Sequence, residues 1–550
     1  MAVRTRRLSL IALVAAAALV WPGRTADGAR AQENARTKLV VIIVVDQMRA
    51  DYLDWYSGNF TSGFTRLLRE GAVFSKAAYP YLNTITCAGH STIGTGTFPY
   101  RHGMIMNNWY DRKTGTSPYC TDDPTMQEIS YNGLTSVQGD SAKRLLTPAI
   151  GEQIMNQGGR SVAISLKPRS AVTLTGHKST AVVWFDDRGG WTTSTAFAKA
   201  PVPYLQEFIT ANPLTADFDK VWERTLPASA YRGDDEVKSE GTTAGWTRSF
   251  PHAMGLPGGK ADAQFYSRWQ RSPFADEYVG RLAIASIDEL KLGRGKATDF
   301  LGVSFSAVDG VGHLFGPRSH EIQDTLVRLD RTIGRLLDHL DRTVGAGSYV
   351  LGLSADHGVA EVPEQTGGGR VSSKSIAQAL EAVLVPAMGP GTHVLSSTYT
   401  NVYLSEDARK RLARDARLRA AALEAVRAVH GIAYVFWGLD LVGAAARQSS
   451  DPVKRAAALS HYPGRSGDII VAPAENWILS TAVTTHGTQY AYDQRVPVIL
   501  LGAAVRGGTY TSAATPADLM PTLAAAANVK IRPTDGRVLK EALLPGRSTP

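Results

Sequence analysis

The sequence predicts an α/β protein with a mostly parallel central sheet flanked by helices and with inserted accessory regions. Apolar runs rich in β-branched residues recur along the chain, as expected of strands that are buried on both faces. Between two of these runs, apolar residues recur at helical spacing, as in a helix that connects parallel strands. The 550 residues are 44% hydrophobic and 20% charged, which suits a globular protein and argues against general disorder.

The expected elements follow one another as strand, helix and strand. A strand is expected at residues 38–45, where Leu39 to Val45 is a continuous apolar run, and a short helix is expected at residues 63–70. Further strands are expected at residues 161–166, 300–308, 349–353 and 496–501. The crossover helix has an apolar stripe made of Ile322, Leu326, Leu329, Ile333, Leu336, Leu337 and Leu340. In such a fold, functional side chains gather at the carboxyl ends of the strands.

Two stretches interrupt this alternation. Residues 186–293 are rich in Trp, Gly, Pro and Ser, and residues 363–480 contain an alanine- and arginine-rich helical region near residues 408–429. Because the candidate functional residues are spread from Asp46 to His486, we expect one catalytic domain over residues 32–550 that carries both stretches as insertions.

The N-terminus has the pattern of a secretory signal peptide at residues 1–31. Three arginines precede an apolar run at residues 8–21, and Ala29-Arg30-Ala31 matches a cleavage site. The run is shorter than the roughly 20 residues of a spanning helix, so no transmembrane anchor is expected in the mature chain. Thr5-Arg6-Arg7 partly matches the twin-arginine export signal. The predicted location is periplasmic or secreted.

Charge and cysteine content narrow the classes of partner. Removal of residues 1–31 takes away five Arg and one Asp, which lowers the formal net charge from +9 to +5. A high positive charge was the main argument for nucleic-acid binding, and much of it belongs to residues 1–31. No nucleic-acid partner is therefore expected. Cys87 and Cys120 are the only cysteines, and either a disulfide or two unpaired core residues would fit an exported protein. We expect the mature protein to be a monomer.

Three apolar runs each end in side chains of the metal-ligand type. Carboxylates and imidazoles delivered together from strand ends are what a two-metal hydrolase requires. These ligands are Asp46 after residues 39–45, Asp309 and His313 after residues 300–308, and the pair Asp356-His357 after residues 349–355.

Each ligand also has a simpler structural explanation. Asp46 taken alone is better explained as a helix cap or as an ion-pair partner. The segment Asp-Gly-Val-Gly-His predicts that Asp309 and His313 meet in a tight glycine-rich turn. Adjacent Asp356 and His357 are the most specific pair, because packing alone does not explain them. His90 and His102 are expected to be structural, hydrogen-bonded within residues 83–103.

A nucleophile is expected in residues 83–92, a stretch of small and hydroxylated residues that leads into Gly94-Thr95-Gly96. Such a stretch can place a helix N-terminus next to an anion. A hydroxyl there becomes a nucleophile if its pKa is lowered. The chemistry does not distinguish Thr84, Thr86, Ser91 and Thr92, and all four are also explained as caps or turn residues.

This segment, with Phe98-Pro99, Arg101-His102-Gly103 and Asn107 to Asp111 after it, resembles the alkaline phosphatase superfamily. Within it, the chain is similar to the threonine-nucleophile alkaline phosphatases related to type I phosphodiesterases and nucleotide pyrophosphatases. The resemblance covers residues 38–109, 165–169, 307–313, 353–358, 485–502 and 515–523.

The resemblance implies a role for each matching residue. Thr86 is implied as the nucleophile that forms a phosphothreonine. One metal is implied at Asp46, Asp356, His357 and the Thr86 oxygen, and a second at Asp309, His313 and His486. Two Zn²⁺ ions are implied, and the mixed ligands agree with zinc without excluding manganese, iron or cobalt.

Lys167 and Arg169 bear on the choice between phosphate monoesters and diesters. Pro168 disfavours helix at Lys167, so an extended segment is expected in which both cations point to one side. A solvated basic turn explains the same pair. The Lys-x-Arg pattern resembles the monoesterase branch of the family. The resemblance implies Asn107 as a further donor to the phosphoryl group, although the adjacent Asn108 is also a candidate.

The leading interpretation is an exported alkaline phosphatase that hydrolyses small-molecule phosphate monoesters and releases inorganic phosphate. The first alternative is a nucleotide pyrophosphatase or phosphodiesterase whose pocket is built by residues 186–293. A binding protein that lost turnover is a second alternative, but the full ligand set argues against it. Sulfatase activity is disfavoured because the nucleophile segment lacks a Cys-x-Pro-x-Arg pattern.

Overall fold

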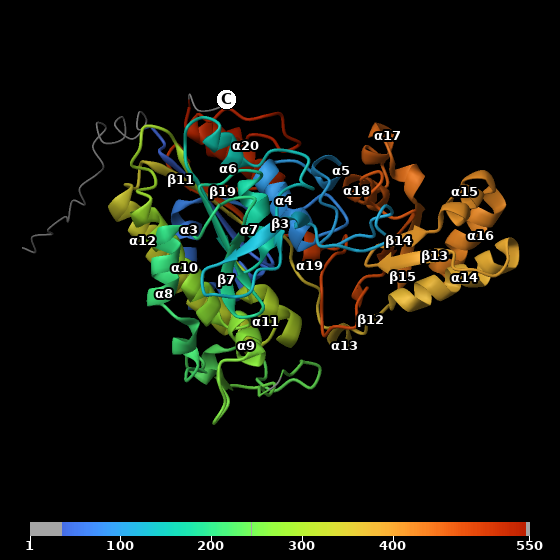
Figure 1. The fold of residues 1–550 in the computed structure, drawn as a ribbon, viewed down its shortest axis with the longest axis horizontal. Helices are drawn as coiled ribbons and strands as arrows, with labels where there is room; N and C mark the ends of the chain where they lie inside the picture. Colours follow the sequence, from blue (N-terminus) through green and yellow to red (C-terminus); the bar gives the residue numbers. More distant parts are fainter. Residues whose placement is uncertain (1–35, 244, 546–550) are drawn as a thin grey trace, which may run out of the picture.

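The computed structural model describes residues 36–243 and 245–545 (Figure 1). The predicted signal peptide at residues 1–31 lies outside the described residues. The centre of the protein is a sheet of 11 strands, in the spatial order β19 (Gly508–Tyr510), β2 (Ala72–Phe74), β18 (Val498–Gly502), β11 (Tyr349–Ser354), β1 (Leu39–Val45), β10 (Asp299–Phe305), β5 (Ser161–Ser165), β6 (Ala181–Asp186), β7 (Gly190–Ser194), β3 (Asp122–Ser130) and β4 (Gln138–Asp140).

The middle of this sheet is parallel, as the sequence predicts. β11, β1, β10, β5 and β6 pair in parallel, whereas β18 joins β11 and β7 joins β6 in antiparallel orientation. Every residue of β1 is fully buried, and its side chains alternate between two apolar clusters on opposite faces. This explains the uninterrupted apolar run, because both faces of the strand are covered.

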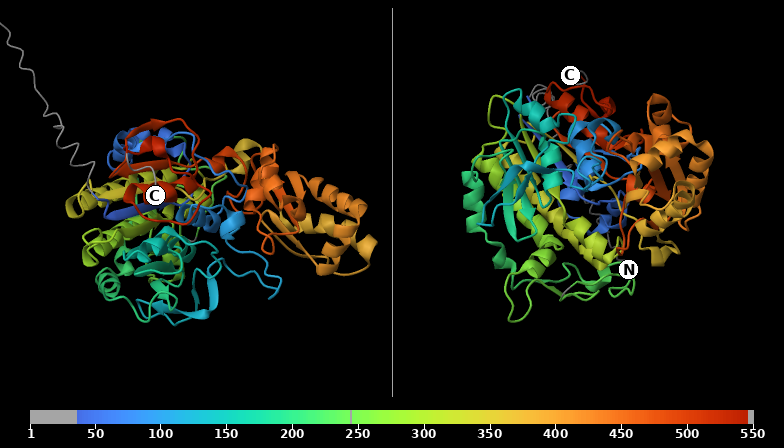
Figure 2. Two further views of the ribbon diagram at one scale, coloured as in Figure 1. Left: turned by 90° about the horizontal axis from the view of Figure 1, so that it is seen from above. Right: turned by 45° about the vertical axis from the view of Figure 1, so that its right-hand side comes forward.

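Helices cover both faces of the sheet (Figures 1 and 2). One layer contains α3 (Gly63–Glu70), α10 (Pro273–Glu289) and α12 (His320–Thr343). The other contains α4 (Thr86–Thr95), α6 (Ile150–Met155), α7 (Pro168–Thr175) and α20 (Leu519–Ala527). The apolar stripe of α12 is completely buried against the sheet, and the Ser319 side chain caps its N-terminus by accepting a hydrogen bond from Ile322 N. The predicted crossover helix is therefore confirmed.

A second, smaller sheet lies beside the main one, where Figures 1 and 2 show it in orange. Its antiparallel strands are β13 (Val394–Thr398), β14 (Asn401–Leu404), β16 (Ile469–Pro473) and β15 (Ile432–Trp437). Three helices accompany it, α14 (Ser373–Met388), α15 (Glu406–Arg414) and α16 (Ala416–Arg427). The alanine- and arginine-rich stretch is therefore helical, as predicted.

The remaining elements are short. Residues 186–293 include α8 (Pro203–Ala211), α9 (Ala263–Gln270) and the two-stranded sheet β8 (Val221–Trp222) and β9 (His252–Ala253). Further helices are α2 (Tyr52–Trp55), α5 (Pro99–His102), α11 (Ala307–Phe315), α13 (Pro363–Thr366), α17 (Ala444–Arg447), α18 (Pro452–Ser460) and α19 (Ala491–Gln494), and β12 (Gly369–Arg370) pairs with β17 (Trp477–Ile478). Within the described residues, every helix is too short or too polar to span a bilayer.

Candidate active site

The carboxyl ends of three neighbouring strands bring the predicted ligands together. β1 lies between β11 and β10, with Val45 opposite Phe305 and Val44 opposite Ser354. Asp46 follows β1 directly, and Asp356 follows β11 after one intervening residue. Because parallel strands end at the same edge of a sheet, residues more than 300 positions apart in the chain become neighbours.

The third ligand group differs from the expectation in one respect. Strand β10 ends at Phe305, and Asp309 and His313 lie on helix α11 rather than in a glycine-rich turn. Residues four apart in a helix share a face, and His313 Nε2 accordingly lies 3.1 Å from Asp309 Oδ1. The expected strand at residues 300–308 was therefore about three residues too long, and the helix itself places both side chains in the site.

Three imidazoles present the same ring nitrogen to the site. The Nδ1 atoms of His313, His357 and His486 each lie within hydrogen-bond distance of a backbone carbonyl, at 2.9, 3.0 and 2.8 Å respectively. A carbonyl oxygen only accepts, so Nδ1 carries the proton in each neutral ring and Nε2 keeps a free lone pair. This is the tautomer and orientation that a metal-binding histidine needs.

The ligand atoms form two adjoining groups, Asp46 with Asp356 and His357, and Asp309 with His357 and His486. In the first group, His357 Nε2 lies 3.2 Å from Asp356 Oδ2 and 3.5 Å from Asp46 Oδ1. Asp46 Oδ1 is buried and has no hydrogen-bond partner among the described residues. A buried, unpaired carboxylate oxygen beside a free imidazole lone pair fits a divalent cation, so the residues present are compatible with metal binding.

The charges of the site are strongly coupled. Burial, followed by the neighbouring carboxylate of Asp356, raises the pKa of Asp46 well above its usual range. At Asp309 burial acts in the same direction, but the charges of Lys167 and His313 outweigh it and hold the pKa of Asp309 well below its usual range. Burial lowers the pKa of His486 well below its usual range, so this imidazole is neutral near pH 7, as a metal ligand must be.

Thr86 is the first residue of helix α4 and faces these ligands. Its Oγ1 lies 3.3 Å from His357 Nε2, and the residue is 1% exposed. The other hydroxyl candidates are placed differently. Thr84 Oγ1 donates to the Thr488 carbonyl, Thr92 Oγ1 bonds to Tyr81 and His102, and Ser91 Oγ has no partner among the described residues. Of the four, Thr86 is the one whose hydroxyl contacts a ligand of the two groups.

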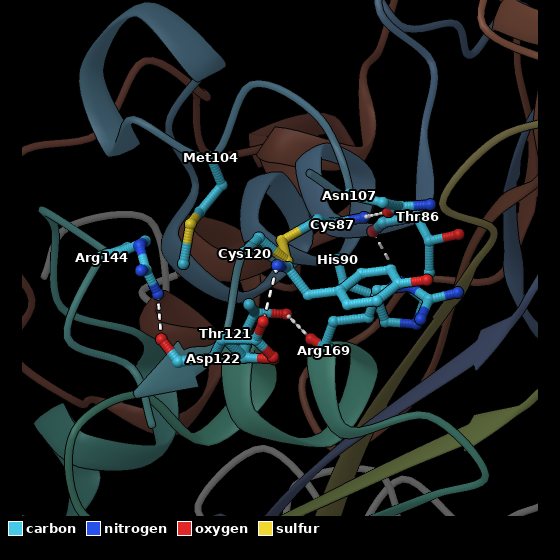
Figure 3. The surroundings of a disulfide bond; sticks show 12 residues. Thr86, Cys87, His90, Met104, Asn107, Cys120, Thr121, Asp122, Arg144 and Arg169 are labelled. Carbon is cyan, nitrogen blue, oxygen red and sulfur yellow. Dashed lines mark hydrogen bonds between the residues drawn. A yellow bond between two sulfur atoms is a disulfide. The ribbon is translucent and has the colours of Figure 1, made fainter. Parts of the chain in front are cut away.

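Asn107 lies against the N-terminus of α4, as Figure 3 shows. Its side-chain oxygen accepts a hydrogen bond of 2.9 Å from the backbone N–H of Cys87, the residue after Thr86. Asn108, the alternative donor, forms a backbone bridge with Tyr119. Cys87 and Cys120 form a disulfide, which the sequence left open (Figure 3).

Lys167 and Arg169 approach the site from the N-terminus of α7. Lys167 is extended as predicted, but Pro168 begins the helix and Arg169 is its second residue, so the extended segment does not continue through Arg169. Proline suits the first helical position because that N–H needs no partner within the helix. Lys167 Nζ lies 2.5 Å from Asp46 Oδ2 and 2.5 Å from Asp309 Oδ2, one carboxylate from each ligand group.

One cavity of about 770 Å³ is lined by seven of the predicted residues, whereas Asp46, Asp356 and His357 are not part of its lining. The buried Nε of Arg169, which lines this cavity, has no hydrogen-bond partner among the described residues. A guanidinium in that state is available to an anionic ligand. The lining includes Thr86, Asn107, Lys167, Arg169, Asp309 and His486.

Two residues of the site were not recognised in the sequence as part of it. Gln47 donates from its backbone N–H to Asp356 Oδ1 at 3.1 Å and from Nε2 to Asp309 Oδ1 at 2.7 Å, and its φ of 65° has no sequence signal. His90 is hydrogen-bonded within residues 83–103 as expected, with Nδ1 3.0 Å from the Thr86 carbonyl, but Nδ1 also lies 3.1 Å from Asp356 Oδ2, which the sequence did not predict. Its position four residues after Thr86 on a helix was a usable signal.

Comparison with known proteins places this fold and site in a family. A sequence profile of the type I phosphodiesterase / nucleotide pyrophosphatase family matches residues 40–493. The chain belongs to this family, within the alkaline phosphatase superfamily. It is accordingly an enzyme of the hydrolase class.

Several relatives are called alkaline phosphatases. The chain is 31% identical to PafA of Elizabethkingia meningoseptica over 509 residues, which are 89% of this chain and 91% of that protein. It is 30% identical to PhoV of Synechococcus elongatus over 514 residues, 91% of each chain. The crystal structure of PafA superposes with a TM-score of 0.84 at 29% identity, over 92% of this chain and 99% of that chain. A murine ectonucleotide pyrophosphatase / phosphodiesterase shares the fold, with a TM-score of 0.56 at 14% identity over 92% of this chain and 100% of its own.

Proposed function

We propose that this protein is an exported, metal-dependent alkaline phosphatase that hydrolyses small-molecule phosphate monoesters through a phosphothreonine and releases inorganic phosphate. The observation that carries the proposal is one cavity lined by Thr86, by Asp309, His313 and His486, and by the phosphate-binding candidates Asn107, Lys167 and Arg169. The other ligand group adjoins this cavity through His357, whose Nε2 lies 3.3 Å from Thr86 Oγ1. Relatives of 30% and 31% identity that are named alkaline phosphatases support the same activity.

The proposal assigns two divalent cations to the ligand groups, with Zn²⁺ favoured by the mixture of imidazoles and carboxylates. One would be held by Asp46, Asp356 and His357 beside Thr86, the other by Asp309, His313 and His486. When bound, the cations supply Lewis-acid chemistry, which lowers the pKa of the nucleophilic hydroxyl and offsets charge on the departing oxygen.

The residues of the chain itself have the following roles in the proposal. Thr86 Oγ1 attacks phosphorus in line with the departing alcohol, and the phosphoryl group passes to Thr86. Water then attacks the phosphothreonine and releases inorganic phosphate. Throughout, the Asn107 amide and the cations of Lys167 and Arg169 bind the phosphoryl oxygens that do not react.

The extra negative charge of a monoester is what Lys167 and Arg169 are proposed to recognise. A diester carries a second organic group in place of one charged oxygen, so these cations contribute less to its binding. The test is kcat/KM of the purified protein on an aryl phosphate and on the matching bis-aryl phosphate. A clear preference for the diester would contradict the proposal and favour the phosphodiesterase that the family description also allows.

Export is proposed from the sequence of residues 1–31 and is supported by the disulfide, because disulfides persist in oxidising compartments. Cell fractionation with N-terminal sequencing of the mature protein tests this part. A cytosolic protein that keeps residues 1–31 would contradict it. Elemental analysis of the purified protein tests the assignment of zinc.

A further inference from the structure

The disulfide and Asn107 are linked through backbone hydrogen bonds (Figure 3). Cys87 N–H donates to the side-chain oxygen of Asn107 at 2.9 Å, and Cys120 N–H donates to the backbone oxygen of Asn107 at 2.7 Å. Each cysteine of the disulfide therefore holds one end of the same asparagine. Cys87 also follows Thr86 directly, so the covalent link begins next to the proposed nucleophile.

These hydrogen bonds determine which end of the Asn107 amide faces the cavity. A backbone N–H only donates, so the amide oxygen must point to Cys87. The NH₂ group is consequently free to donate, and Asn107 lines the cavity beside Thr86. A phosphoryl oxygen accepts hydrogen bonds and never donates them when ionised, so this orientation is the productive one for binding phosphate.

The segment that carries Asn107 leads from a buried cluster into an exposed hairpin. Asn108 pairs with Tyr119, and Asp111 pairs with Thr116, so residues 107–120 form an irregular hairpin in the described structure. Asn107 is only half-buried, and Tyr119 is 57% exposed. In contrast, both cysteines are fully buried, within an apolar cluster that also contains Met104, Met106 and Trp109. The disulfide thus connects the base of an exposed hairpin to the buried start of α4.

We propose that the Cys87–Cys120 disulfide is a positioning element that holds the Asn107 amide toward the phosphoryl group and thereby increases activity on phosphate monoesters. This inference rests on the proposed function. If the disulfide only stabilises the fold, its removal lowers the melting temperature. In that case the removal changes kcat/KM by the same factor in the presence and in the absence of the Asn107 side chain.

A double-mutant cycle separates the two roles. The disulfide is removed as Cys87→Ala/Cys120→Ala and, to retain more apolar volume in the cluster, as Cys87→Ala/Cys120→Val. Each pair is made in the wild-type and in the Asn107→Ala background. For each protein, kcat/KM on an aryl phosphate, Tm and zinc content are measured. A conservative control, Cys87→Ser/Cys120→Ser, tests whether small polar side chains can substitute for the covalent link.

We expect removal of the disulfide to lower kcat/KM about tenfold in the wild-type background, the size of one hydrogen bond to a charged group. In the Asn107→Ala background the same removal should change kcat/KM less than about twofold, because the amide to be positioned is already absent. Zinc content should remain at the wild-type level in every variant that folds.

Equal fold-losses in the two backgrounds would overturn the inference, as would a lower Tm with unchanged kcat/KM. If the variants do not fold, the disulfide of the folded wild-type protein is reduced with a trialkylphosphine. In this reaction the phosphine takes oxygen from water and becomes a phosphine oxide, and the disulfide becomes two thiols. Full activity with both thiols counted by mass spectrometry would then overturn it. If the wild-type protein itself does not hydrolyse monoesters, the proposed function is wrong. If the wild type is active but the disulfide variants give the results above, only the inference about the disulfide is wrong.

Discussion

Replacement of Arg169 by alanine is the sharpest test of how the enzyme selects its substrate. Arg169 is the second residue of α7, lines the cavity with Thr86, and has a buried Nε without a partner among the described residues. The substitution therefore removes a guanidinium that no protein group engages at that nitrogen. Its loss should be expressed in substrate binding rather than in protein stability.

The size of the effect follows from the number of charged hydrogen bonds lost. Each hydrogen bond to a charged group is worth about 1.5–3 kcal/mol, and a guanidinium can bind two phosphoryl oxygens. Because the cavity is open to solvent, we take the lower value for each bond, about 3 kcal/mol in all, which corresponds to roughly a hundredfold loss in kcat/KM for monoesters. A diester offers one charged oxygen fewer, so its loss should be about tenfold.

The assay compares kcat/KM of Arg169→Ala and wild type on an aryl phosphate and on the matching bis-aryl phosphate. Arg188→Ala is the matched control, because Arg188 lines the same cavity but its guanidinium is already paired with Asp186 at 2.7 Å and with Glu128. The control should change both activities slightly and equally. If Arg169→Ala lowers both activities by the same factor, Arg169 does not recognise the extra charge and the reasoning is wrong.

Three further predictions concern the nucleophile, the metals and the pH dependence of stability. Thr86→Ala should lower turnover by about a thousandfold or more with unchanged metal content, and wild-type turnover in this variant would exclude Thr86. Dialysis against a chelator should abolish turnover and lower Tm, because the buried carboxylates lose their counter-charge, and Zn²⁺ should restore both; full activity of the metal-free protein would contradict the metal assignment. Burial raises the pKa of Glu321 to about 9, from an ordinary value of 4.5, so the folded protein keeps a proton that the unfolded chain releases. The protonated Glu321 contributes fully to the free energy of unfolding below pH 4.5. This contribution is lost as the pH rises toward 9, at about 1.4 kcal/mol per pH unit. Glu321→Gln should therefore gain Tm relative to wild type between pH 5 and pH 8, and a difference in Tm that does not change with pH would contradict this.

The candidate ligands Asp46, Asp356 and His357 were predictable because each lies within three residues of the end of its strand in the chain. A buried run followed by Asp46, or by Asp356 and His357, is a local pattern, and parallel neighbours place such positions at one edge. The error at Asp309 and His313 has a physical reason. A Cβ on Gly312 would lie 1.9 Å from Gln47 Oε1, so this glycine permits close packing of α11 and does not mark a turn.

The rule that the residue before a proline is extended predicted Lys167 correctly but did not predict the helix that begins at Pro168. Proline restricted Lys167 to an extended conformation, with φ of −115° and ψ of 131°, as predicted. The same proline also starts helices well, and α7 begins there. Whether a helix follows depends on what its apolar face can bury, and Ala171, Val172 and Leu174 of α7 pack onto the main sheet.

The sequence by itself determined the α/β class, five of the strands in the main sheet and the chemical types of the candidate ligands, because hydrophobic periodicity and ligand chemistry are local properties of the chain. It did not predict the buried strands β6, β7, β14 and β16. Residue chemistry left four hydroxyls open and the family resemblance implied Thr86, but only the tertiary structure shows the contact of Thr86 with His357. It alone shows that Gln47 bridges Asp309 and Asp356, and that Cys87 and Cys120 hold Asn107. These are contacts between residues far apart in the chain or within reach of several equivalent neighbours. Such contacts depend on how helices α4, α7 and α11 pack at the carboxyl ends of the central strands. The spacing of residues along the sequence does not specify this packing.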